Sequence, residues 1–161
     1  MKVKATMTKD VIWARPTDSL RDVYDILRDA EIRHLAVVDE EAHIVGVITQ
    51  SDLFLYAVVA ENEVHIPDIP VQKAMTPDPI VCHEDSSIEH VAQVMIDEKV
   101  NCVPVTRGRR LVGMVTSSDV MSLIVARERI ATRAGSAIDY RLRSWRDFMG
   151  HQAGAVSGAA L

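Results

Sequence analysis

The sequence lacks the long apolar runs that a membrane span requires. Its longest uninterrupted apolar segments, Leu53 to Ala60 and Leu123 to Ala126, are far shorter than the roughly 20 residues that cross a bilayer. We expect no secretory signal either, because the N-terminal Met-Lys-Val-Lys-Ala-Thr-Met leads directly into charged sequence. We therefore expect a cytoplasmic protein without membrane contact.

Cysteine is scarce, and the histidines form no recognisable metal or catalytic pattern. Cys82 and Cys102, in a chain without an export signal, are expected to be free thiols in a reducing compartment. Neither of them shows the spacing of a catalytic triad or zinc site with His34, His83 or His90. Both cysteines also fall on predicted core strands, where a buried thiol is ordinarily inert. The sequence thus predicts no enzyme, no catalytic residue and no metal site.

Positive charge is also in short supply over most of the chain. The net charge is −5, but residues 1–121 carry 12 basic and 20 acidic side chains, whereas residues 122–161 carry six arginines and three acids. An acidic body argues against nucleic acid binding there. With 161 residues and 48% apolar content, the chain can form an ordinary packed core.

An internal repeat organises what the sequence does contain. Residues Ile44 to Leu53 read Ile-Val-Gly-Val-Ile-Thr-Gln-Ser-Asp-Leu, and Leu111 to Val120 read Leu-Val-Gly-Met-Val-Thr-Ser-Ser-Asp-Val. Upstream the match continues at an offset of 68, which aligns Met7 with Met75, and a polar turn absorbs a one-residue slip. The chain is therefore a tandem duplication.

Each repeat has the pattern of strand, helix, strand, strand and helix. In the first repeat we expect strands at Val11 to Ala14, Leu35 to Val38 and Ile44 to Ile48, a helix opened by Thr17-Asp18-Ser19, and a second helix over Ser51 to Ala60. In the second repeat the elements are Ile80 to Cys82, Ser87 to Glu98, Val103 to Thr106, Leu111 to Val115 and Ser118 onward. Residues 61–70 form a polar connector. Because a repeat of about 55 residues would be marginal alone, we expect the two sheets to pack together in one pseudo-symmetric α+β domain.

The predicted boundaries are 1–66 for the first motif, 67–130 for the second, and 131–161 for a C-terminal extension. The second helix of each motif is apolar on nearly every face, as in Leu-Phe-Leu-Tyr-Ala-Val-Val-Ala from Leu53. A helix that packs on one sheet needs only one apolar stripe, so we expect a homodimer through these helices. The extension is basic, and we expect a helix with an apolar stripe from Ile138 to Met149, followed by a flexible tail.

Thr followed three residues later by Asp has two interpretations. Thr49 and Thr116 stand at the predicted helix starts, and Asp52 and Asp119 complete a capping box that needs no ligand. The same groups could also bind a nucleoside phosphate. Helix N-terminal amides favour phosphate, and a carboxylate can accept both hydroxyls of a ribose.

The duplicated Gly-apolar-apolar-Thr-x-x-Asp motif, in a repeat with this order of elements, resembles the tandem CBS-domain (Bateman module) family. The resemblance covers residues 3 to about 128. It implies a stand-alone CBS pair, a regulatory module that takes AMP, ADP, ATP, NAD or S-adenosylmethionine as a regulatory ligand and needs no cofactor. We expect the regulated target to be a separate effector protein.

In that family the motif Asp holds ribose, the motif Thr reaches phosphate, and the base lies between the first strand and the strand after the first helix. The resemblance implies one site of Thr49, Asp52, Ile12, Arg33, His34 and Leu35. It implies a second site of Thr116, Asp119, Ile80, Asn101, Cys102 and Val103. The first motif has Leu35-Ala36-Val37 where family members often have apolar-Pro-Val, and only Arg33, not Asn101, offers a cation, so we expect unequal affinities.

An alternative function is a protein–protein interaction module, or an RNA-binding one, that acts through the basic C-terminal helix. In that case both Thr-x-x-Asp motifs would be helix caps only. Thermal unfolding with AMP, ATP, NAD or S-adenosylmethionine distinguishes the two functions. A ligand that binds only the native state must raise the melting temperature, whereas an interaction module without a nucleotide site would show no change.

Overall fold

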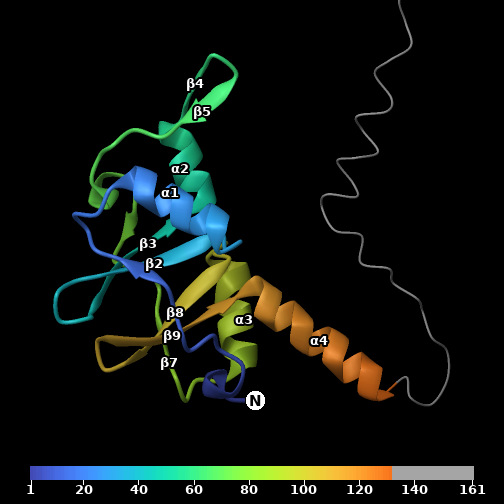
Figure 1. The fold of residues 1–161 in the computed structure, drawn as a ribbon. Coiled ribbons are helices and arrows are strands. Elements are labelled where there is room, and N and C mark those ends of the chain that lie inside the picture. The colour runs from blue at the N-terminus through green and yellow to red at the C-terminus, as the bar shows by residue number, and fades with distance from the viewer. Residues whose placement is uncertain (132–161) are drawn as a thin grey trace, which may run out of the picture. The chain divides into compact units, whose positions relative to one another are not determined.

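The structure, a computed structural model, describes the backbone of residues 1–131 and the side chains of residues 1–127 (Figure 1). Residues Met1–Val125 form one compact unit, and the chain from Ala126 onward belongs to a second. The predicted helix from Ile138 and the tail lie outside the described residues. No helix within residues 1–131 is both long and apolar enough to cross a bilayer.

Both motifs have the predicted order of elements. The first contains β1 (Trp13–Ala14), α1 (Leu20–Asp29), β2 (His34–Val38), β3 (Ile44–Thr49) and α2 (Gln50–Tyr56). The second contains β7 (Cys82–His83), α3 (Ile88–Asp97), β8 (Cys102–Arg107), β9 (Arg110–Thr116) and α4 (Ser117–Ala131). Short 3₁₀ turns at Val3–Ala5 and Val71–Lys73 precede the two motifs. Ser19 and Ser87 cap α1 and α3 by accepting a backbone N–H of the first turn.

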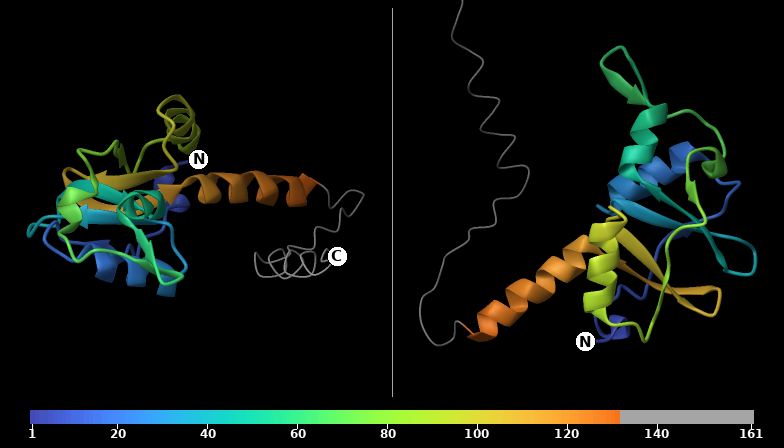
Figure 2. Two further views of the ribbon diagram at one scale, coloured as in Figure 1. Left: turned by 90° about the horizontal axis from the view of Figure 1, so that it is seen from above. Right: turned by 180° about the vertical axis from the view of Figure 1, so that it is seen from behind.

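The two sheets are built in the same register. In each, a parallel pair (β1 with β2, β7 with β8) is followed by an antiparallel hairpin (β2 with β3, β8 with β9). His34 lies opposite Thr49, and Cys102 lies opposite Thr116. Because opposite residues in a sheet are close neighbours, the motif threonines adjoin the starts of β2 and β8. Helices α1 and α3 cover opposite outer faces of the paired sheets (Figure 2).

Each sheet is completed by the segment that precedes the other motif. Strand β6 (Thr76–Pro77), which leads into the second motif, pairs antiparallel with β3 of the first. Thr8, which leads into the first motif, exchanges two backbone hydrogen bonds of 2.9 Å with Met114 of the second. The motifs are therefore tied together by an exchange of flanking segments.

The predicted packing of the two sheets is confirmed by the hydrophobic core. One cluster belongs to the first motif and includes Leu20, Leu35 and Ile48, and a second belongs to the other motif. The third cluster is shared, since Ala36 and Val47 of the first motif pack with the second motif. Its buried members are Ala36, Val47, Cys102 and Met114. A core of this kind makes the two motifs one structural unit.

The end of α2 differs from the prediction. The helix expected over Ser51 to Ala60 ends at Tyr56, and a hairpin of β4 (Val58–Ala60) and β5 (Glu63–His65) follows (Figure 1). Its two loop residues, Glu61 and Asn62, have φ of 53° and 64°. Positive φ at both positions is the geometry of a type I′ hairpin turn, and the valines of β4 and β5 favour strands.

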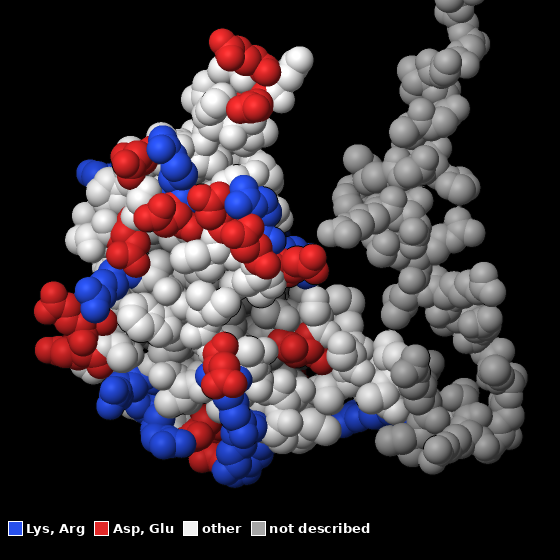
Figure 3. Space-filling model, in the orientation of Figure 1, with Lys and Arg blue, Asp and Glu red and all other residues white. Residues whose placement is uncertain are grey.

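The turns that absorb the one-residue slip between the repeats lie side by side. The β2–β3 turn is acidic and the β8–β9 turn is basic, and the two regions adjoin in Figure 3. The backbone N–H of Ile44 donates to the carbonyl of Arg109 at 3.3 Å, and that of Leu111 donates to the carbonyl of Ala42 at 3.1 Å. Opposite charge here supports the same pairing of the two motifs.

Candidate functional site

Both motif aspartates form the predicted capping boxes. The backbone N–H and hydroxyl of Thr49 donate to Oδ2 of Asp52 at 2.8 and 2.7 Å, and the Asp52 N–H donates to the Thr49 hydroxyl at 3.3 Å. Thr116 and Asp119 repeat these bonds at 2.7, 2.8 and 3.4 Å. Within residues 1–127 no hydrogen bond reaches Oδ1 of either aspartate. The cap therefore leaves one oxygen of each carboxylate available to a ligand.

Asp52 lines a cavity of about 580 Å³, here named the Asp52 cavity. The first motif contributes Thr49 and Asp52 to its wall, and the second motif contributes the segment before β7 and the start of β8. The predicted site residues found in it are Thr49, Asp52, Ile80, Asn101, Cys102, Arg33 and His34.

Asp119 lines a cavity of about 280 Å³, here named the Asp119 cavity. Thr116 and Asp119 come from the second motif, whereas the segment before β1 and the start of β2 come from the first. The predicted site residues found in it are Thr116, Asp119, Ile12, Arg33 and His34. Each cavity thus combines the Thr-x-x-Asp pair of one motif with the first strands of the other.

The predicted grouping of the residues into two sites is wrong. The resemblance implies Ile12 with Asp52, and Ile80 with Asp119, but the structure places each isoleucine with the other aspartate. The exchange follows from the pseudo-symmetric packing, which brings the helix start of one motif against the strands of the other. Leu35 and Val103 line neither cavity, because they are 0% and 1% exposed within the two motif cores.

An exposed isoleucine lines each cavity at equivalent repeat positions. Ile12 in the Asp119 cavity is 43% exposed, and Ile80 in the Asp52 cavity is 37% exposed. An apolar side chain that remains accessible in a concave polar site offers a surface on which a flat base can pack. The cavities therefore combine an apolar wall with a free carboxylate oxygen.

The charges of the two cavities differ. Three carboxylates in the Asp119 cavity, of Asp10, Glu31 and Asp119, stand against one guanidinium, Arg33. The Asp52 cavity holds two carboxylates, Asp52 and Asp78, and two cations, Arg33 and Lys99. Arg33 lines both cavities, and its Nη2 donates to the Ser118 hydroxyl across the motif boundary at 3.1 Å.

Two titratable groups at the cavities are shifted towards their neutral forms. Burial lowers the pKa of His34, and the Arg33 charge lowers this pKa further, while Asp52 acts in the opposite direction. Burial raises the pKa of the Cys102 thiol to about 11, and the Asp52 charge adds to that effect. Both groups are therefore uncharged near neutral pH, so His34 serves as a neutral hydrogen-bonding group.

Several cavity residues are not among those predicted from the sequence. The most informative are two residues of opposite charge, Glu31 in the Asp119 cavity and Lys99 in the Asp52 cavity, and the hydroxyl of Ser118. Glu31 and Lys99 occupy equivalent positions at the repeat offset of 68, with φ of 53° and 56°. The repeat alignment shows that the two are equivalent, but it does not identify either as a site residue, because neither aligns with a predicted one.

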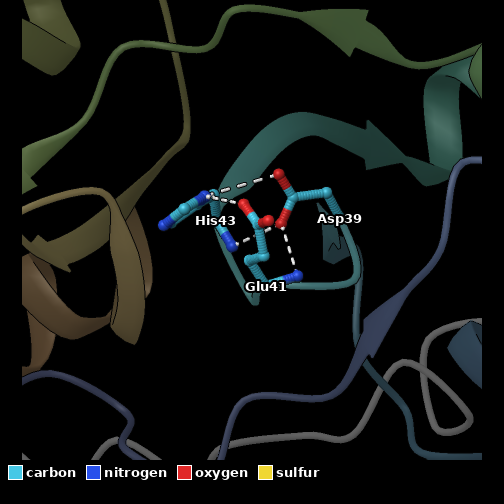
Figure 4. A group of neighbouring side chains, drawn as sticks. All are labelled: Asp39, Glu41 and His43. Carbon is cyan, nitrogen blue, oxygen red and sulfur yellow. Dashed lines mark hydrogen bonds and ion pairs between the residues drawn. The ribbon is translucent and has the colours of Figure 1, made fainter.

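A further group of metal-binding residue types lies away from both cavities, in the β2–β3 turn (Figure 4). One ligand atom each of Asp39, Glu41 and His43 lies within 4.8 Å of the others. Oδ1 of Asp39 accepts the backbone N–H groups of Glu41 and His43 at 3.0 and 2.9 Å, and these bonds close the turn. Turn formation therefore accounts for this arrangement without an ion.

Two β-α-β-β-α motifs that exchange flanking segments and share a core define a tandem-repeat α+β module. The CBS domain signature matches residues 3–59 and 68–126. The chain belongs to the CBS domain family and carries two copies of the domain.

Relatives of the chain include both short and long proteins. An uncharacterised protein, YlbB of Bacillus subtilis (strain 168), is 34% identical over 140 residues, which are 85% of this chain and 88% of that protein. L-aspartate semialdehyde sulfurtransferase of Methanocaldococcus jannaschii is 36% identical over 129 residues. Those residues are 76% of this chain but only 24% of the sulfurtransferase, so its activity belongs to a much larger protein.

Solved structures share the fold. The CBS domain pair of protein MJ0100, in complex with 5′-methylthioadenosine and S-adenosyl-L-methionine, is 34% identical with a TM-score of 0.69. The match covers 79% of this chain and 98% of that one. The structure of CBSX2 in complex with AMP is 23% identical with a TM-score of 0.71, covers 80% of this chain and 99% of that one, and supports the fold alone.

Proposed function

We propose that this protein is a non-catalytic regulatory module that binds adenine nucleosides or nucleotides in its two cavities. The observation that carries the proposal is the free Oδ1 of each motif aspartate, in a cavity that also contains an exposed isoleucine. A carboxylate oxygen suits a ribose hydroxyl, and the isoleucine suits a base. The ligands of the MJ0100 domain pair, both of which contain adenosine, support this class of ligand.

Regulation would follow from the composition of the cavities. Each cavity is lined by both motifs, so a ligand in either one contacts both. Its binding free energy then depends on how the motifs are arranged, and occupancy shifts the population of arrangements. The candidate ligands are AMP, ADP, ATP, NAD and S-adenosylmethionine, and the readout would be passed to a separate effector protein in the cytoplasm.

The proposal includes a homodimer formed through the second helices. Apolar side chains remain exposed on both of them: Leu55 is 82% exposed on α2, and Met121 and Ile124 are 55% and 58% exposed on α4. Apolar surface that is not covered within one chain favours association with another, and a two-fold axis would let each chain cover the other.

Isothermal titration calorimetry on the Asp52→Asn and Asp119→Asn variants tests the binding proposal. An asparagine keeps a carbonyl oxygen for the helix cap but replaces the second acceptor by an NH₂ donor. We expect each substitution to lower the affinity of one of the two sites about tenfold or more, while the melting temperature stays close to that of the wild type.

Two variants serve as controls. Asp22→Asn, on the exposed face of α1, removes the same charge away from both cavities and should bind normally. Asp52→Ala also removes the cap and should in addition destabilise the fold by about 0.5–2 kcal/mol. If none of the five candidate ligands binds the wild-type chain at millimolar concentration, the proposed function is wrong.

A further inference from the structure

We propose that the two cavities select ligands of different charge: the Asp52 cavity takes a phosphate-bearing adenine nucleotide, and the Asp119 cavity takes a neutral or cationic adenine nucleoside. This inference rests on the proposed function, which it refines by assigning a ligand class to each site. Its basis is the set of charged residues that line the two cavities.

One pair of equivalent positions sets the difference in charge. Glu31 lines the Asp119 cavity, and Lys99 lines the Asp52 cavity at the same place in the repeat. The adjacent carboxylates do not differ, because Asp10 and Asp78 are also equivalent and each lines one cavity. The exchange of Glu for Lys therefore leaves the Asp119 cavity rich in carboxylates and gives the Asp52 cavity a cation for phosphate.

Arg33 strengthens this separation because both cavities share it. Its equivalent in the second motif is Asn101, so within residues 1–127 Arg33 is the one guanidinium that lines either cavity. It is exposed, and its hydrogen bond to Ser118 ties it to the side of the Asp119 cavity. A phosphate in the Asp52 cavity would compete with Ser118 for the guanidinium. Once that phosphate has bound Arg33, the charged side chains left to contact a second anion in the Asp119 cavity are all carboxylates.

The helix dipole does not alter this assignment. Helix α2, which starts at the Asp52 cavity, has only seven residues, whereas α4, at the Asp119 cavity, has 15. A dipole argument alone would place the phosphate at α4. Side-chain charges within the cavities favour the opposite assignment, because Lys99 lines only the Asp52 cavity and its full charge exceeds the half charge of a helix terminus.

AMP and adenosine are the probes that test the proposal, because they differ only in the phosphate. In calorimetry we expect AMP to bind one site per chain strongly and a second site weakly. The ratio of the two dissociation constants should be at least about tenfold larger than for two identical, independent sites. Adenosine should still bind one site after saturation with AMP. The strong AMP event should disappear in Asp52→Asn, and the remaining adenosine event should disappear in Asp119→Asn.

A charge swap provides the decisive variant. The double substitution Glu31→Lys with Lys99→Glu keeps the net charge and changes two exposed side chains whose backbones have nearly the same positive φ. We expect it to move the strong AMP event to the Asp119 cavity, so that Asp119→Asn rather than Asp52→Asn abolishes it. Arg33→Ala should weaken the strong AMP event about tenfold or more with little change for adenosine. Arg109→Ala, which removes a cation from the β8–β9 turn, should change neither.

The outcomes separate this inference from the proposed function. Two AMP sites of equal affinity, or a strong AMP event that depends on the same aspartate before and after the swap, would overturn the charge selection alone. Absence of binding for both AMP and adenosine would overturn the proposed function together with it.

Discussion

Cys102 can report on occupancy of the Asp52 cavity, because its thiol lines that cavity while Cys82 lines neither. Burial raises the pKa of both thiols to about 11. At pH 8 only about one thiol in a thousand is then ionised, so both should react with a disulfide reagent about a hundredfold more slowly than a free cysteine. The rates should rise about tenfold per pH unit between pH 8 and 10.

AMP should slow the modification of Cys102 further and leave that of Cys82 unchanged, as measured by mass spectrometry of the labelled chain. In guanidinium chloride both thiols should react at the ordinary rate, which provides the control. Rapid modification of Cys102 at pH 8 that AMP does not affect would contradict the placement of this residue at the site.

Individual residues were predictable to the extent that they belong to the repeated motif. Thr49, Asp52 and their equivalents were identified from the spacing and the duplication of the motif, and the structure confirms that they cap their helices. Arg33 was expected in one site but lines two. Spacing identifies a residue type at a position, whereas the number of cavities that a long side chain borders depends on the packing of the other motif.

At the scale of elements, each motif glycine lies where the segment before the other motif crosses its strand. A Cβ at Gly113 would lie 2.5 Å from Sδ of Met7 and 3.0 Å from the carbonyl oxygen of Thr8. A Cβ at Gly46 would meet Sδ of Met75 in the same way. Each glycine therefore allows the segment before the other motif to cross its strand closely.

We expect Gly113→Ala to lower the free energy of unfolding by about 1–3 kcal/mol, because Met7 and the Thr8 backbone must both move. Thermal unfolding would measure this as a fall of several degrees. In a double-mutant cycle, Met7→Ala should relieve part of the clash, so the two substitutions should be less than additive. A Gly113→Ala protein as stable as the wild type would show that the methionine does not pack on this strand.

The order of elements was predicted correctly, but the connector was not. Residues 61–70 read as polar sequence, and Val58 and Val59 read as the end of an apolar helix. In the structure the two valines belong to β4, whose turn depends on positive φ at Glu61 and Asn62. Neither residue is glycine, so the usual signal of a two-residue hairpin was absent.

For the whole molecule, the feature that the sequence could not reveal is which motif supplies which part of a site. Repeats align just as well whether each cavity is built within a motif or between motifs. Only the tertiary arrangement decides, and here β6 and Thr8 cross to the other sheet. Because each cavity depends on both motifs, neither motif alone is expected to bind a ligand.

Dimer formation is the prediction that belongs to the whole molecule. The surface expected to form the interface includes Leu55 on α2, 82% exposed, and Ile124 on α4, 58% exposed. A glutamate at Leu55 would place a charge in a desolvated interface, so Leu55→Glu should convert a dimer to a monomer in light scattering coupled to size-exclusion chromatography. Ile96→Glu is the matched control, because Ile96 is 71% exposed on α3 and outside this surface. If Leu55→Glu and wild type have the same mass, or if Ile96→Glu dissociates the dimer instead, the second helices are not the interface.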